Sequence, residues 1–312
     1  MPSFSAKHTL STLTHATALS EFDSLVRRGL VVHSPCKIVR LTVDNFHFEF
    51  QISKSLTNKP QSGQGLQPSD KDSPDRPATF GPGSDLACPT PDLILATIHE
   101  THILVPNGYS VFRPQYLLLT QDSYRRQHEP LSLQDLEAVR AVLCALATDG
   151  TRRRRYFAMF NCGHVAGASR QHKHMHIIPW KASRAGILPT NRNPRSCDIP
   201  FVHFRAALSP SEFRAEGYAK VVVDKYVALL GQMQAALGDW TQGSGGECMP
   251  HNVILVEEWI LVIPRSKDRY SQDVTVNGAG MAGSVWLDRE EVLERWLEIG
   301  PLEVLRGVGY AV

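Results

Sequence analysis

The chain has 312 residues, of which 42% are hydrophobic and 21% are charged, so it can bury a substantial core in one large or two modest domains. The 33 lysines and arginines nearly balance the 31 acidic residues, and the formal charge of +2 argues against a nucleic-acid-binding surface or a membrane-adsorbing face. No segment approaches the roughly 20 apolar residues of a membrane-spanning helix, so we expect a soluble protein.

Six cysteines are scattered along the chain without paired spacing, and the N-terminal residues lack a secretory signal pattern. Both features favour free thiols in a cytoplasmic protein, which could also be nuclear. The cysteines are Cys36, Cys88, Cys144, Cys162, Cys197 and Cys248.

The N-terminal quarter predicts one helix followed by strands. From about residue 15 to 30, apolar residues recur at helical spacing, and Gly29 is a natural stop. Residues 36–52 alternate between apolar and polar side chains as a strand does. Residues 53–91 are rich in Ser, Pro, Gly and Asp, and this composition predicts a disordered or weakly ordered loop.

The next elements are a hairpin and a helix. Apolar runs at 94–105 and 116–120 flank a turn-forming stretch, which predicts two paired strands. Ser132 and Asp135 form a weak capping box before an apolar stripe that extends to Leu146, which predicts a core-facing helix.

The segment Asn161–Pro179 carries the chemistry. Its three histidines, His172, His174 and His176, are spaced by two residues and would share one face of a strand, whereas a helix would turn His174 away from the others. The residues just before them are small, so backbone N–H groups could approach an anion closely, and a phosphate site fits best. A metal site fits less well, because no acidic residue lies in this segment and no C-x-x-C occurs in the chain.

Beyond Trp180 the sequence is polar through Pro194, and a helical stretch follows at about 211–237. Two strands at 251–264, a glycine-rich segment at 277–284 and a helix at about 288–297 complete the chain. We therefore divide the sequence into a catalytic region, residues 1–185, and a smaller α+β unit, residues 186–312.

The chain resembles the histidine-triad superfamily, and more closely its diadenosine tetraphosphate phosphorylase, or ATP adenylyltransferase, branch. The resemblance rests on Asn161-x-Gly163, Gly167-Ala168-Ser169 and His172-x-His174-x-His176. The segment from Arg126-Gln127 to Pro130-Leu131, the segment Asn58-Lys59-Pro60, and Pro264-Arg265-Ser266 with the glycine-rich stretch resemble further elements of the family. The resemblance implies an α+β fold with a mostly antiparallel, histidine-triad-like sheet flanked by helices.

By this resemblance, His174 attacks the α-phosphorus of diadenosine tetraphosphate and becomes adenylylated, and inorganic phosphate then accepts the adenylyl group, giving ATP and ADP. The backbone carbonyl of His172 would accept the Nδ1 proton of His174, and His176 completes the catalytic set. Residues implied to bind substrate are Asn161, Gly163, Gly167, Ala168, Ser169, Gln171, Lys59, Arg126, Gln127, Asn277 and Gly280. Lys59 could equally be a solvated loop lysine.

Two other functions remain open. This branch commonly has glutamine at the third triad position, whereas His176 matches the hydrolases of the superfamily, so water could take the adenylyl group from dinucleoside polyphosphates or nucleoside phosphoramidates. A non-catalytic nucleotide-binding protein is the alternative of another class. We expect no protein-bound cofactor, Mg²⁺ only as the counterion of the nucleotide, small nucleotides and phosphate as ligands, and a monomer or homodimer.

Overall fold

The structure is a computed structural model and describes residues 7–57, 78–149, 152–180, 199–238 and 248–312. It is a mixed α+β fold built on one eight-stranded sheet, in which every pair of neighbouring strands is antiparallel. This agrees with the predicted fold class. The strands, in their order across the sheet, are β12 (Phe204–Ala207), β14 (Trp259–Pro264), β13 (His251–Leu255), β10 (Tyr156–Cys162), β11 (His174–Pro179), β7 (Tyr116–Thr120), β5 (His102–Pro106) and β4 (Ala96–Ile98).

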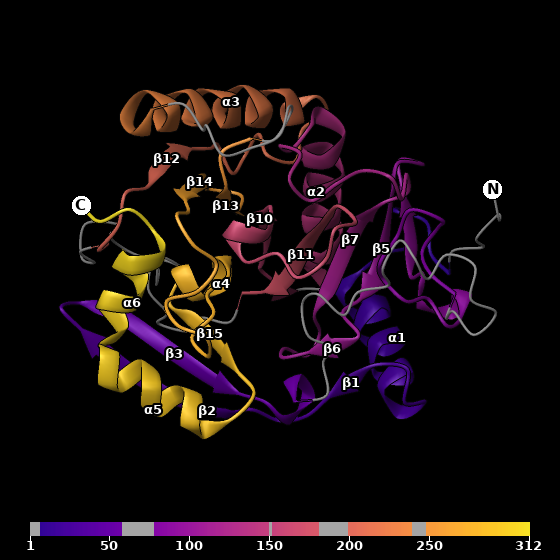
Figure 1. Cartoon of the computed structure of the whole chain (residues 1–312). Coiled ribbons are helices and arrows are strands. Elements are labelled where there is room, and N and C mark those ends of the chain that lie inside the picture. The colour runs from indigo at the N-terminus through magenta and orange to yellow at the C-terminus, as the bar shows by residue number, and fades with distance from the viewer. Residues whose placement is uncertain (1–6, 58–77, 150–151, 181–198, 239–247) are drawn as a thin grey trace.

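Both faces of the central strands are buried, because each face lies against a separate apolar core. In β10, Ala158 and Phe160 belong to one core while Phe157 and Met159 belong to the other, as the alternation of side chains along a strand requires. The first core is covered by three helices (Figure 1), namely α1 (His15–Arg27), α2 (Leu133–Leu146) and α3 (Tyr218–Leu237). Among the described helices, none has the length and apolarity that crossing a membrane requires.

The second core lies between the large sheet and a three-stranded sheet with C-terminal helices (Figure 1). In the small sheet, β15 from the C-terminal region runs parallel to β3 from the N-terminal region, with Val285 opposite Phe50. The elements on this side are β2 (Lys37–Val43), β3 (Phe46–Ile52), β15 (Ser284–Leu287), α4 (Gly278–Met281), α5 (Glu290–Ile299) and α6 (Pro301–Val308).

The two regions of the sequence therefore share both sheets. Strand β10 of the N-terminal region pairs with β13 of the C-terminal region, from Ala158 opposite Leu255 to Cys162 opposite His251. A boundary at residue 185 remains a prediction about the sequence, but it does not separate two sheets.

The predicted helix cap at Ser132 is present, and α1 has a cap of the same kind. The side chain of Ser132 accepts a hydrogen bond from the backbone N–H of Asp135, and the Asp135 carboxylate accepts one from the N–H of Ser132. Thr14 and Thr17 make the equivalent reciprocal pair at the start of α1. Local hydrogen bonding at both positions explains where these helices begin.

Local structure differs from the sequence predictions in three places. The range 94–105 is two strands, because His99 and Glu100 adopt positive φ angles of 49° and 57° in a tight turn that no glycine or asparagine announces. Strand β12 lies between the predicted polar stretch and the predicted helix, where the sequence predicts no element. The predicted loop at 53–91 has defined structure at both ends: residues 54–56 form a 3₁₀ turn, and Phe80, Ser84 and Cys88 are buried. Its middle, residues 58–77, lies outside the described residues.

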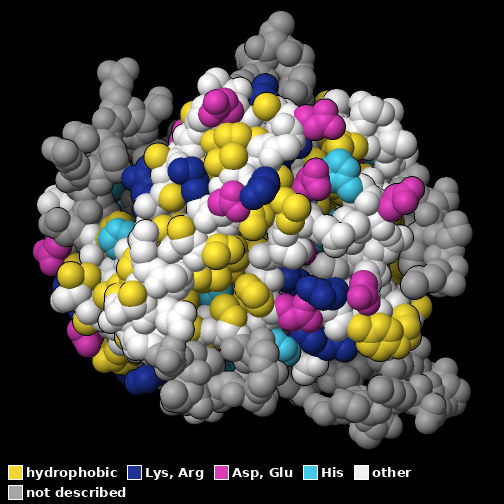
Figure 2. Space-filling view, turned by 90° about the horizontal axis from the view of Figure 1, so that it is seen from above, with side chains coloured by type: hydrophobic (Ala, Val, Ile, Leu, Met, Phe, Trp, Pro, Cys, Tyr) yellow, Lys and Arg dark blue, Asp and Glu magenta, His cyan; other side chains and the backbone are white. Residues whose placement is uncertain are grey.

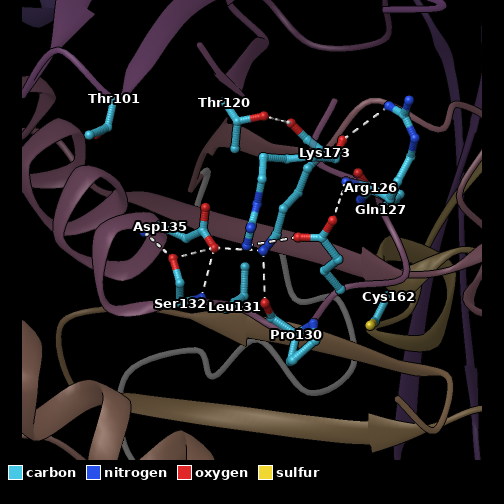
Figure 3. Close-up of polar contacts among 12 residues, drawn as sticks. Thr101, Thr120, Arg126, Gln127, Pro130, Leu131, Ser132, Asp135, Cys162 and Lys173 are labelled. Atoms are coloured by element: carbon cyan, nitrogen blue, oxygen red, sulfur yellow. Dashed lines mark hydrogen bonds and ion pairs between the residues drawn. The ribbon is translucent and has the colours of Figure 1, made fainter. Parts of the chain in front are cut away.

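A buried group of charges joins α2 to the strand of histidines (Figure 3). The ammonium of Lys173 lies 2.7 Å from Asp135 Oδ2 and 2.7 Å from the carbonyl oxygen of Pro130, and Lys173 has no exposed surface. His102 Nε2 donates to the other oxygen of Asp135 at 3.0 Å. Burial raises the pKa of Asp135, but hydrogen bonds from His102 and the charge of Lys173 outweigh it and hold that pKa below its usual range.

Removing the Asp135 carboxylate should be costly, because it leaves the Lys173 ammonium buried without its counter-ion. We expect Asp135→Ala to lower the free energy of unfolding by about 3–5 kcal/mol in urea denaturation followed by circular dichroism. The double variant with Lys173→Met should recover part of this loss. Asp224→Ala, which breaks the exposed pair with Lys220 on α3, is the control and should cost less than about 1 kcal/mol. Equal losses of stability in Asp135→Ala and Asp224→Ala would contradict this account.

Candidate active site

His174 and His176 lie on β11 and face the second core, on the same side of the sheet as Asn161 at the end of β10. The strand alternation requires this, because Met175 and Ile177 belong to the helix-covered core. The ring centroids of the two histidines are 5.4 Å apart. The prediction that all three histidines lie on one strand holds for these two, but His172 lies before β11 begins.

The imidazole of His174 is held in one tautomer. Its Nδ1 lies 2.8 Å from the backbone carbonyl oxygen of His172, and a carbonyl can only accept, so Nδ1 carries the proton. The lone pair is then on Nε2, as nucleophilic attack requires. The predicted hydrogen bond to the His172 carbonyl is confirmed.

His172 lies before β11, where its fully buried ring is fixed at both nitrogens. Nε2 donates to the backbone carbonyl of Thr120 at 2.8 Å, and Nδ1 accepts from the hydroxyl of Ser84 at 2.8 Å. Burial lowers the pKa of His172 to about 4, so the ring is neutral at physiological pH. His172 therefore sets the backbone that orients His174.

Residues 84 and 85 support this backbone, although the sequence assigned them to a weakly ordered loop. Besides the hydroxyl of Ser84 on the His172 ring, the carboxylate of Asp85 accepts the backbone N–H groups of Gln171 at 2.8 Å and His172 at 3.0 Å. The apolar residues Phe80, Leu86 and Cys88 around them are a sign in the sequence that this part of the loop packs against something.

Gln127 fixes the backbone on both sides of the site. Its Oε1 accepts the N–H of His174 at 2.7 Å, and its Nε2 lies 3.0 Å from the carbonyl oxygens of His174 and Asn161. The side chain is buried, with 3% of its surface exposed. These contacts give Gln127 a positioning role, and its contact with substrate remains a prediction.

Asn161 lies at the junction of the two sequence regions. Its Oδ1 accepts from Asn252 Nδ2 at 2.8 Å and from the N–H of Gly278 at 3.0 Å, which leaves its Nδ2 as the group able to donate to a phosphate oxygen. A Cβ at Gly278 would lie 2.9 Å from Asn161 Oδ1, so only glycine allows this approach.

The glycine-rich turn is fixed against the C-terminal segment by its shape and by a buried arginine. Gly167 has a φ of 87°, and a Cβ there would lie 2.7 Å from the carbonyl oxygen of Val276. The fully buried guanidinium of Arg265 donates to the carbonyls of Ala166 and Val276 and to Asn252 Oδ1. Arg265 thus joins the turn, the glycine-rich segment and β13.

Aromatic side chains border the ring of His176. Trp286 of β15 packs edge-on against it with centroids 6.1 Å apart, and Phe112 packs against Trp286 at 5.6 Å. Because Trp286 comes from the small sheet, the third triad position is enclosed by a residue far away in sequence. Nothing in the sequence marked Trp286 as a neighbour of the histidines.

The remaining predicted residues are placed less closely. Gly163, Ala168 and Ser169 belong to the glycine-rich turn, and Gln171 is exposed just before His172. Arg126 Nη1 donates to the carbonyls of Gly83 and Ser123, so it also orders the loops around the site. Asn277 Oδ1 accepts from the N–H of Gly280 at the start of α4. Lys59 lies outside the described residues.

Over the described ranges, one group of side chains has the spacing of a metal site. The possible ligand atoms of Cys162, Cys248 and His251 all lie within 4.8 Å of one another. None of the triad histidines belongs to it.

Two family models cover most of the chain. Residues 14–192 match the Ap4A phosphorylase N-terminal domain, and residues 197–311 match the ATP adenylyltransferase C-terminal domain. The chain belongs to the Ap4A phosphorylase family.

Two Saccharomyces cerevisiae proteins are similar in sequence to this Ap4A phosphorylase family member. Diadenosine 5',5'''-P1,P4-tetraphosphate phosphorylase 2 is 29% identical over 203 residues, which is 59% of this chain and 62% of the relative. Protein APA1 is 26% identical over 215 residues, which is 64% of this chain and 65% of the relative. The matched part is therefore less than two thirds of each relative's length.

Crystal structures of yeast Ap4A phosphorylase Apa2 share the fold. One matches with a TM-score of 0.73 at 21% identity, over 95% of this chain and 94% of that one. The structure of Apa2 in complex with Ap4A matches with a TM-score of 0.68 at 21% identity, over 96% and 98% of the two chains.

Replacing Gln127 by glutamate tests its positioning role. A carboxylate cannot donate to the carbonyls of Asn161 and His174, so these buried acceptors would face an anion, and we expect a loss of about 2–4 kcal/mol in the free energy of unfolding. Gln121→Glu changes an exposed glutamine on a neighbouring loop in the same way and should cost little. Equal losses in the free energy of unfolding for Gln127→Glu and Gln121→Glu, measured by denaturant titration, would contradict the positioning role of Gln127.

The buried neutral ring of His172 predicts a pH dependence of stability. Its pKa is about 6.5 in the unfolded chain and about 4 in the folded one, so the unfolded state binds more protons between these values. This stabilisation is complete above pH 6.5 and is lost as the pH falls toward 4. Melting temperatures at pH 7.5 and pH 5 should differ more in the parent than in His172→Asn, and an equal difference would be inconsistent with a neutral His172.

Proposed function

We propose that the chain catalyses the phosphorolysis of diadenosine tetraphosphate to ATP and ADP through an adenylyl group on Nε2 of His174. The observation that carries the proposal is the hydrogen bond from His174 Nδ1 to the carbonyl of His172, which directs the lone pair of the ring to Nε2 in a member of this family. The printed name of one yeast relative is that of a diadenosine tetraphosphate phosphorylase, and Apa2 has been crystallised with Ap4A and with AMP.

In the first step, Nε2 of His174 forms a bond to the α-phosphorus while the bond from that phosphorus to the bridging oxygen breaks, and ATP leaves. The ring becomes positively charged, and the hydrogen bond from Nδ1 to the His172 carbonyl stabilises this charge. In the second step, an oxygen of inorganic phosphate attacks the same phosphorus, the P–N bond breaks and ADP leaves.

The spreading charge on the phosphate oxygens needs donors close to His174. We assign this role to Nδ2 of Asn161, to Ser169 and Gln171, and to backbone N–H groups of the turn that includes Gly163 and Gly167. The assignment is best supported for Asn161. Its Oδ1 already accepts from Asn252 and Gly278, so the orientation of its side-chain amide is fixed.

Hydrolysis is the competing reaction, and His176 is the observation that favours it. An imidazole at this position can move a proton to or from water, whereas the glutamine that is common in this branch can only make fixed hydrogen bonds. A water molecule would then release AMP from His174. Nucleotide binding without catalysis is the remaining alternative.

The proposed chemistry uses no metal held by the protein, and Mg²⁺ would enter as the counterion of the nucleotide. The protein would bind nucleotides and phosphate rather than nucleic acid or membrane. On the face over α3, basic and acidic side chains lie among one another (Figure 2), in keeping with the formal charge of +2. A cytoplasmic location, with nuclear presence also open, and a monomeric or homodimeric state belong to the same proposal.

One incubation separates the three functions. The purified protein is mixed with diadenosine tetraphosphate with and without inorganic phosphate, and the products are resolved by anion-exchange chromatography. ATP and ADP formed only with phosphate support phosphorolysis, AMP formed without phosphate means hydrolysis, and binding without turnover means a non-catalytic protein.

The variant His174→Ala should lose at least about a thousandfold in turnover while it still binds the nucleotide, because the site has no second nucleophile in the same position. His203→Ala is the matched control. His203 lies outside the site but makes the same kind of bond, with its Nδ1 3.0 Å from the carbonyl oxygen of Phe201. Turnover and titration calorimetry measure the two effects. Activity close to that of the parent would exclude His174 as the nucleophile.

The variant His176→Gln should shift the acceptor from water toward phosphate and leave the first step largely intact. The reason is that the amide lacks the proton-transfer capacity of imidazole, whereas attack depends on His174. The measurement is the ratio of AMP to ADP at fixed phosphate, with quenched-flow detection of the adenylylated protein. An unchanged ratio together with a collapsed adenylylation rate would place His176 in the nucleophilic step.

A further inference from the structure

Two cysteines meet beside the catalytic turn. Cys162 is the last residue of β10, between Asn161 and Gly163, and Cys248 lies three residues before His251, which faces Cys162 in the sheet register. The two sulfur atoms and a ring nitrogen of His251 lie within 4.8 Å of one another. Neither thiol has a part in the proposed phosphoryl chemistry.

We propose that Cys162 and Cys248 are a modification site, in which a hydroperoxide oxidises Cys248 and the product closes to a reversible Cys162–Cys248 disulfide. The burial of the two residues orders the steps. Cys248 is half-buried, so a small oxidant can reach it, whereas Cys162 has 1% of its surface exposed and can react only with its neighbour.

The environment of Cys248 favours its thiolate. His251 Nδ1 lies 2.7 Å from the carbonyl oxygen of Met249, so it carries a proton, and the same N–H group lies 3.7 Å from Cys248 Sγ. The contact with the Cys162 thiol lowers the pKa of Cys248; burial opposes this effect, and His251 adds to it. The pKa of Cys162 is raised both by its contact with Cys248 and by burial. One sulfur is thus prepared to attack and the other to remain a thiol until it is needed.

The reaction balances with one hydroperoxide. The thiolate of Cys248 attacks the outer oxygen, an S–O bond forms as the O–O bond breaks, and the alkoxide or hydroxide leaves and takes up a proton. The sulfur of Cys162 then attacks the sulfenic sulfur of Cys248, an S–S bond forms as the S–O bond breaks, and the released hydroxide takes the Cys162 proton to give water. Two thiols are oxidised by two electrons, and the peroxide is reduced.

The same three residues could be considered as zinc ligands, but the hydrogen bonds of His251 favour thiol chemistry. Its Nδ1 is occupied by the Met249 carbonyl at 2.7 Å and its Nε2 by the hydroxyl of Tyr226 at 2.8 Å. A metal would have to displace one of these partners. Disulfide formation leaves both in place.

The disulfide would reach the active site through the backbone around Cys162. The Cys162 thiol lies 3.4 Å from the carbonyl oxygen of His128, and the N–H of Gly163 donates to the carbonyl of Gln127 at 2.9 Å. Figure 3 shows Cys162 near the loop that carries Gln127 and Pro130. Oxidation removes the thiol proton from this loop, so we expect a several-fold lower turnover, a consequence that rests on the proposed function.

The test uses the whole 312-residue chain, treated with hydrogen peroxide and then alkylated, digested and mapped by mass spectrometry. We expect a peptide pair joining Cys162 to Cys248, two hydrogen atoms lighter than the separate peptides and reversed by dithiothreitol. Cys248→Ser should prevent the link and keep its activity during exposure to peroxide. Cys144→Ser, which removes another half-buried thiol, is the matched control and should behave as the parent.

Two results would overturn the proposal. One is oxidation of Cys248 to a sulfinic acid without a link to Cys162. The other is one equivalent of zinc in the protein as purified, lost in Cys248→Ser, since the cluster would then be a metal site. Peptide mapping needs no turnover, so a protein without phosphorylase activity would refute the proposed function and leave this test unchanged.

Discussion

The geometry of the site depends on the hydrogen bond between His174 Nδ1 and the carbonyl of His172. The ring and the carbonyl belong to residues only two positions apart, so the local backbone brings them together. His203 and His251 make the same contact elsewhere in the chain. What distinguishes His174 is therefore its surroundings. The carbonyl that accepts its proton is fixed by a buried His172 ring, by Ser84 and by Asp85, so the nucleophilic nitrogen has one direction.

These supports come from distant parts of the sequence, and two polar side chains connect them. Gln127 joins the ends of β10 and β11 through three backbone groups, and Arg265 joins the glycine-rich turn to the C-terminal segment. Gln127 makes these bonds to backbone groups, and Arg265 donates both to backbone carbonyls and to the side chain of Asn252. A polar network of this kind fixes atomic positions more narrowly than apolar packing does.

The sequence was sufficient for the features that arise locally. The shared strand face of His174 and His176 and the capping box of Ser132 and Asp135 depend on short-range geometry, and the structure has them. Pairings across the chain carry no such local mark: nothing near residue 286 indicates a tryptophan against His176, and nothing near residue 84 indicates a hydroxyl on His172. The composition of residues 53–91 predicted disorder or weak order, yet Ser84 and Asp85 near its end are hydrogen-bonded to the backbone and ring next to His174.

The parallel pairing of β15 with β3 has a consequence for how the protein is made. Strand β3 leaves the ribosome more than 230 residues before β15, the strand that it needs as a partner, so the small sheet stays incomplete through most of synthesis. Trp286 arrives with β15, and His176 lacks its aromatic neighbour until then. A nascent chain in which His174 and His176 have already folded into β11 would thus lack this part of the site, which would be completed only in the last tenth of translation.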